Sequence, residues 1–125
     1  MTVKKSKTDT SVILVEAIVN GMLDKKGKEI ISLNLAKINS TVCDYFVICH
    51  GTSRTHAVAI AESVEESVKK HCGFNPGRRE GFINGEWMLM DYLDVVVHIF
   101  QEPARRFYQL EELWADVPAE RISDD

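Results

Sequence analysis

The sequence predicts an α/β fold: a single mixed sheet of about five strands with helices packed on it. Apolar residues recur every three or four positions in the stretches 12–22 and 57–68, the period of a helix with one buried face. Two nearly continuous apolar runs, 45–49 and 94–100, are typical of central strands covered on both faces. The order of helix, strand, strand, helix, two or three strands and helix suits one sheet with helices on it.

The first eight residues are polar and lysine-rich and are expected to form a flexible N-terminus. A first helix should begin at a cap among Asp9, Thr10 and Ser11 and run to about residue 24. The three- and four-residue spacing predicts that one face of this helix packs on the sheet. That face would carry Val12, Val15, Val19 and Met22.

Residues 30–35 are predicted as the first strand and 45–49 as the second, with a turn at Asn39 and Ser40. Gly51-Thr52-Ser53 ends the second strand and opens a long helix that Gly73 terminates. The stretch 75–85 is rich in turn residues and has room for one short edge strand.

Residues 87–92 and 94–100 are predicted as two further strands joined by a short acidic connection. Pro103 suits the first turn of a last helix. We therefore expect one domain over residues 9–115 and a flexible acidic tail over 116–125. The apolar side of the last helix would carry Phe107, Leu110, Leu113 and Trp114.

The composition is that of one globular domain: 125 residues, of which 45% are hydrophobic and 27% charged. Three cysteines without paired short spacing indicate reduced thiols. No apolar run approaches the roughly 20 residues of a membrane span, and no secretory signal follows the basic N-terminus. The expected location is cytoplasmic.

Charge is distributed unevenly along the chain. Residues 1–79 carry 12 Lys and Arg against 8 Asp and Glu, whereas residues 80–125 carry 3 against 11. An acidic surface repels nucleic acid, whose binding requires cations, and attracts a basic protein. The second half therefore points to a protein partner, although acidity that only confers solubility remains an alternative.

Two blocks of residues resemble the signature of the Iojap family of ribosomal silencing factors. The first is Asp44–Cys49 (DYFVIC) with Gly51-Thr52-Ser53 and His56. The second is Trp87 with Asp91, the run 94–98 (DVVVH), and then Arg106, Tyr108, Leu110, Glu111, Leu113 and Trp114. Together the matches span about residues 10–115.

The resemblance implies a nucleotidyltransferase-like fold without catalysis. It also implies docking on the 50S subunit, through the fourteenth protein of the large-subunit series, so that the small subunit cannot join. The resemblance implies no cofactor, and it implies that the protein forms a homodimer. One departure is Leu93, which stands where the family has glycine before the DVVVH run. If that turn needs a positive φ, leucine is unfavourable there, so the connection is expected to take a different shape.

The partner-binding residues that we predict lie around the acidic connection: Trp87, Leu89, Asp91, Tyr92, Asp94 and His98. Trp87 would be an exposed aromatic anchor, unless its side of the strand packs under a helix. His98 would contact the partner or, alternatively, be a buried neutral histidine bonded to backbone.

The alternative function is a nucleotide-binding enzyme of nucleotidyltransferase type. In it the turn Gly51-Thr52-Ser53 would cradle a phosphate and Asp91 with Asp94 would hold magnesium. Residues three apart on a strand point to opposite faces, which counts against a shared metal. Ser53 or Thr52 is expected to cap the helix instead. No structural metal site is predicted, because Cys43, Cys49, His50, His71 and Cys72 lack the paired spacing of zinc ligands.

Overall fold

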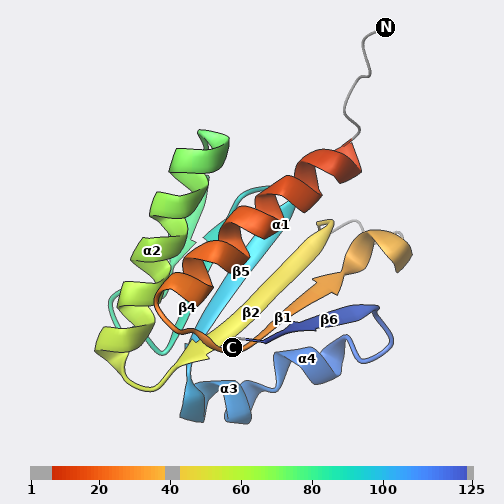
Figure 1. Cartoon of the computed structure of the whole chain (residues 1–125). Helices are drawn as coiled ribbons and strands as arrows, with labels where there is room; N and C mark the ends of the chain where they lie inside the picture. Colours follow the sequence, from red (N-terminus) through yellow and green to blue (C-terminus); the bar gives the residue numbers. More distant parts are fainter. Residues whose placement is uncertain (1–6, 39–42, 124–125) are drawn as a thin grey trace, which may run out of the picture.

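A mixed sheet of six strands, in the order β3-β4-β5-β2-β1-β6, forms the centre of the computed structural model (Figure 1). The structure describes residues 7–38 and 43–123. The predicted turn at Asn39 and Ser40 lies outside them, as do residues 1–6 of the expected flexible N-terminus. The elements are α1 (Lys7–Asp24), β1 (Lys28–Asn34), the 3-10 helix η1 (Leu35–Ile38), β2 (Tyr45–Gly51), α2 (Arg54–Cys72), β3 (Arg78–Glu80), β4 (Trp87–Asp91), β5 (Val95–Gln101), α3 (Glu102–Tyr108), α4 (Leu110–Leu113) and β6 (Ala119–Ile122).

The two apolar runs of the sequence are the central strands, as predicted. β2 and β5 are parallel neighbours, and nearly all their residues are buried. Every other pairing in the sheet is antiparallel. Helices on both faces explain why neither strand alternates between apolar and polar residues.

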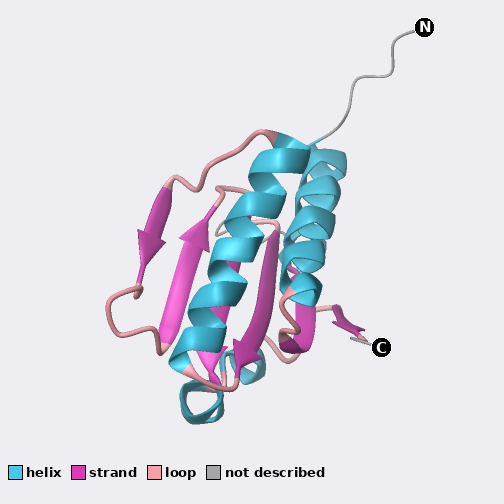
Figure 2. Ribbon diagram, turned by 60° about the vertical axis from the view of Figure 1, so that its left-hand side comes forward, coloured by secondary structure: helices cyan, strands magenta, loops and turns pink. Residues whose placement is uncertain are grey.

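Helices α1 and α2 cover one face of the sheet and pack against each other (Figure 2). The two helix backbones lie close together at Gly21: a Cβ added there would lie 2.7 Å from the Cα of Val64. Ser63 and Ser67 donate to the α1 carbonyls of Gly21 and Ala17 at 2.8 and 2.7 Å. This seam needs small and hydroxyl-bearing residues, which leave the two helix backbones near each other.

The predicted apolar face of the first helix is wrong at its start. Val12 is 39% exposed, whereas Leu14, Ala17 and Ile18 are buried with Met22. The helix carries a second apolar stripe with the same spacing. Packing against α2 buries this second stripe instead of the predicted one.

The short helices α3 and α4 lie on the opposite face of the sheet (Figure 1). The single last helix predicted from Pro103 is interrupted at Gln109, which has φ 48°. As a result Leu110 is buried, but Phe107 is 78% exposed and Leu113 is exposed too. The expected four-residue apolar side therefore does not exist as one surface.

The expected flexible tail is partly ordered. Ala119–Ile122 form β6, which pairs with β1 at the edge of the sheet, and the Val117 side chain is buried. The acidic sequence carries little apolar signal, and the backbone pairing that orders it leaves no mark in the composition. The sheet gains its sixth strand from this segment. Among the described residues, no helix is long and apolar enough to cross a membrane.

Candidate protein-docking surface

β4 alternates between the two faces of the sheet. Met88 and Met90 are buried on the side of α1 and α2, whereas Trp87, Leu89 and Asp91 are partly exposed on the other side. The register sets Leu89 opposite His98 on β5. The structure therefore brings four of the predicted partner-binding residues to one face: Trp87, Leu89, Asp91 and His98.

Trp87 is neither a fully exposed anchor nor fully packed under a helix. Its indole ring stacks on Phe100, with 4.9 Å between the centroids, and contacts Tyr108 of α3 at 4.8 Å. One edge of the ring is thus covered by α3, and the residue remains partly exposed. Trp87 is a rigid aromatic side chain at a surface, the type enriched at protein interfaces.

His98 is buried, as in the second interpretation, but its partner is a side chain rather than backbone. The indole N–H of Trp87 donates to Nδ1 of His98 at 3.1 Å, which places the imidazole proton on Nε2. Burial lowers the pKa of His98 to about 4, so the ring is neutral at physiological pH. Nε2 is buried and has no hydrogen-bond partner among the described residues.

A groove of about 380 Å³ lies beside Leu89. Its apolar walls include Phe46 of β2, and the ring of His98 contributes to it. Arg78 and Asp91 border the groove, and their charged atoms are 4.0 Å apart. The rim is therefore not purely acidic, because β3 adds a cation. The remaining lining residues are Leu93 and Val96.

Two of the predicted residues are not part of this groove. Tyr92 is buried in the core under α1 and α2, and burial raises the pKa of its hydroxyl. It lies on the opposite side of the sheet because it follows Asp91 in the strand alternation. Asp94 is half-buried, and its carbonyl accepts the backbone N–H groups of Asp44 and Tyr45 at 2.7 and 3.1 Å.

The connection between β4 and β5 holds its leucine in the region of backbone conformation that glycine favours. Leu93 has φ 72° although it carries a side chain. Its N–H donates to Oδ1 of Asp91 at 2.8 Å, which holds the turn. Asp91 therefore supports the turn and faces Arg78, so both its oxygens have neighbours other than a metal.

Arg105 is almost fully buried, and it is paired with the carboxylate of Glu111. Its Nε donates to Oε2 of Glu111 at 3.2 Å, and its Nη1 donates to Nδ1 of His50 at 2.9 Å and the carbonyl of Lys28 at 3.2 Å. These contacts join α3 and α4 to the ends of β1 and β2. Arg105 thereby fixes the two helices that cover Trp87 and Phe46. No local pattern signals this role, since the partners are far apart in sequence.

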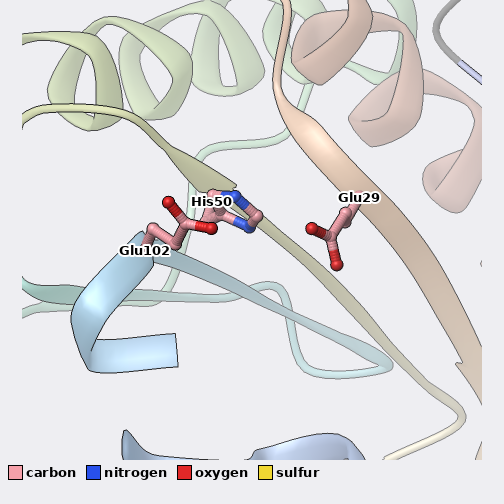
Figure 3. Close-up of side chains that lie close together, drawn as sticks. All are labelled: Glu29, His50 and Glu102. Carbon is pink, nitrogen blue, oxygen red and sulfur yellow. The ribbon is translucent and has the colours of Figure 1, made fainter. Parts of the chain in front are cut away.

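Glu29, His50 and Glu102 form the group of described residues whose side chains lie close enough to share a cation (Figure 3). Arg106 already binds both carboxylates, at 2.6 Å from Glu29 and 3.1 Å from Glu102. The hydrogen bond to Arg106 lowers the pKa of Glu29, and burial lowers that of His50. The guanidinium of Arg105 occupies Nδ1 of His50 and puts its proton on Nε2, so neither nitrogen is available as a ligand. The group is better described as an ion-pair network.

The residues of the turn Gly51-Thr52-Ser53 make contacts within the protein that compete with phosphate binding. Ser53 caps α2, since its Oγ accepts the N–H of His56 at 3.0 Å. The N–H of Thr52 donates to Nδ1 of His56 at 2.9 Å, and Nε2 of that ring lies 2.7 Å from the carbonyl of Lys25. A Cβ at Gly51 would approach the N of Ala57 to 2.7 Å. The N–H groups of Thr52 and His56 therefore already have partners within the protein, which counts against a phosphate cradle at this turn.

All three cysteines are free thiols. Cys49 is fully buried among core residues, and burial raises its pKa to about 12. Burial also raises the pKa of Cys43, to about 11. Neither thiol ionises near neutral pH, so neither is suited to act as a nucleophile.

The chain is similar to known proteins in both sequence and structure. The profile of a protein family described as "Ribosomal silencing factor during starvation" matches residues 8–125. The chain is 40% identical over 105 residues to ribosomal silencing factor RsfS of Halalkalibacterium halodurans, covering 84% of this chain and 88% of that protein. The RsfS of Bacillus subtilis is 41% identical over 95 residues, 76% and 79% of the two chains. A crystal structure of a Bacillus halodurans protein superposes with a TM-score of 0.74 at 37% identity, over 87% of this chain and 97% of that one.

Proposed function

This chain belongs to the ribosomal silencing factor family, and we propose that it docks on the large ribosomal subunit and sterically blocks association with the small subunit. The proposed partner is a basic ribosomal protein of the intersubunit face, the fourteenth in the large-subunit series. Silencing by this route takes place on cytoplasmic ribosomes and represses translation without a catalytic step. Two bodies cannot occupy one surface, so the bound protein itself is the inhibitor.

The observation that carries this proposal is the unequal covering of the sheet. α3 and α4 cover only part of the face that bears Trp87 and Leu89, and the remaining part is a groove with apolar walls. A rigid aromatic residue next to a partly exposed leucine is the composition of an interface hot spot. The Nε2–H of His98, which has no partner in the described part of the chain, lies beneath this surface and adds a donor that a bound acceptor would satisfy after a small adjustment.

Charge supports a basic partner. The segment 80–125 has eight more acidic than basic side chains, and Glu80, Glu86 and Asp91 lie on or near the strands that form this surface. Opposite charge steers the encounter and raises the association rate, while the apolar contacts slow dissociation. The association rate should therefore fall as salt concentration rises, because screening shortens the range of the attraction.

The decisive experiment is co-sedimentation of the chain with isolated large subunits, together with a subunit-association assay. Leu89→Arg puts a cation and extra bulk into the groove and should weaken binding by about 30-fold or more, the size of a hot-spot loss. The variant should no longer prevent formation of joined ribosomes. Ile13→Arg is the matched control, since Ile13 is a partly exposed aliphatic residue on α1, the opposite face.

The outcomes separate cleanly. Loss of binding in Leu89→Arg with retention in Ile13→Arg supports docking through this face. Equal binding by both variants would place the contact elsewhere on the molecule. Failure of the unaltered chain to bind large subunits at low salt would reject the proposed function.

A further inference from the structure

The turn between β4 and β5 holds its leucine in a conformation that side chains rarely adopt. Leu93 has φ 72°, and the N–H of Asp94 donates to the carbonyl of Tyr92 at 2.9 Å, closing a three-residue turn around it. Turns of this kind with positive φ at the centre are rare and strained. The loop has only two residues between the paired Tyr92 and Val95, and its first position favours glycine.

Packing within the chain does not compensate for this conformation. The side chain of Leu93 is 79% exposed, so folding removes little of its apolar surface from water. The turn is held by backbone bonds and by Oδ1 of Asp91, none of which needs a leucine. An exposed apolar residue in a strained conformation lowers the stability of the isolated protein, and such outliers are concentrated at functional sites.

Leu93 is also continuous with the groove. It lines the same hollow as Leu89, Phe46 and Val96, next to the Arg78–Asp91 pair. The leucine thus extends the apolar surface of the groove beyond the sheet, at the tip of a short and well-bonded turn. A protruding aliphatic side chain on a rigid support fits a hollow on another protein with little loss of conformational freedom.

We propose that Leu93 is an apolar anchor that enters an apolar hollow on the basic ribosomal protein, and that it determines how strongly this chain prefers its partner. The inference rests on the proposed function, because it names the residue that adds affinity to the same surface. The partner should present aliphatic or aromatic side chains beside its cations. An anchor that becomes buried contributes about 10- to 100-fold in affinity.

The test measures the dissociation constant of the full chain for purified large subunits, together with its melting temperature. Leu93→Gly removes the side chain and the strain, so it should raise the melting temperature while weakening binding about 10- to 100-fold. Leu93→Asn should act in the same way on binding, since asparagine tolerates positive φ and is polar. Leu93→Met keeps the apolar volume and should bind within about threefold of the unaltered chain.

Ile83→Ala is the matched control, because Ile83 is a 90% exposed aliphatic residue on the β3–β4 loop. It should leave the affinity unchanged. Opposite effects of Leu93→Gly on stability and on binding support the anchor, since a residue that only shaped the turn would be replaced by glycine without loss. Unaltered affinity in Leu93→Gly overturns the anchor and leaves the proposed docking in place. Absence of binding by the unaltered chain overturns both.

Discussion

The two faces of the sheet are covered in different ways. On one face, α1 and α2 bury a continuous apolar cluster in which nearly every side chain is inaccessible, and serine hydroxyls join the helices. On the other, α3 and α4 cover the end near β1 and β2 but leave Trp87 and Leu89 partly exposed. The first face therefore serves stability, whereas the second combines a smaller core with a surface suited to a partner.

The comparison teaches that the two faces are attached differently. The face under α1 and α2, the closed face, is held by apolar packing with two serine hydrogen bonds, whereas the face under α3 and α4, the open face, depends on a buried charged side chain. α3 and α4 are too short to bury a wide stripe, and Phe107 and Leu113 remain exposed. Arg105 supplies the missing attachment through its contacts with Glu111, His50 and Lys28.

The largest expected effect comes from removing that attachment. Arg105→Ala leaves Glu111 and the carbonyl of Lys28 without their partner and should lower the free energy of unfolding by about 4 kcal/mol. Urea titration measures the change. Arg106→Ala is the control, because its guanidinium is half exposed and its ion pairs should contribute less than about 1 kcal/mol. Equal losses in the two variants would mean that Arg105 does not anchor the open face.

A somewhat smaller loss is expected on the closed face. Ile60→Ala removes a fully buried side chain of α2 and should cost about 3 kcal/mol. Its affinity for large subunits, measured per folded molecule, should not change, because α2 lies on the side opposite the groove. Weaker binding by the fully folded variant would show that the faces are not independent.

The smallest effect concerns His98 and pH. The unfolded imidazole takes up a proton near its ordinary pKa of 6.5, whereas burial lowers the folded pKa to about 4. The unfolded state thus binds more protons in this window, and stability falls as pH falls, by roughly 1.5 kcal/mol between about pH 6.5 and pH 5. Replacing the residue in His98→Gln should flatten this part of the profile. An unchanged slope, measured by urea titration at each pH, would contradict a buried neutral His98.

The two central strands were the most predictable part of the fold. The runs around Val47 and Val97 are apolar on both faces, and this pattern alone indicates two central strands. The family resemblance inferred from the signature residues is confirmed by the matching family profile. The last helix was predicted less well, because its apolar spacing continues through Gln109 although the backbone there does not.

The candidate docking surface was predictable only in part. Alternation along β4 grouped Trp87, Leu89 and Asp91, and it should also have excluded Tyr92. Phe46 and Val96 could have been added only from the register between strands, which depends on side-chain packing across the sheet. Arg78 lies at the rim of the groove because it belongs to the edge strand β3. This strand has three residues, too few to show a periodic pattern in the sequence.

The sequence by itself determined the α/β class, the two central strands, a helix cap at Thr52 or Ser53 and the acidity of the second half, because each depends on residues near one another in the chain. Only the tertiary structure decided which stripe of α1 is buried, that the tail adds β6, and that Arg105 joins distant elements. These features depend on contacts between residues far apart in sequence. Such contacts stabilise the protein only once the whole sheet has formed.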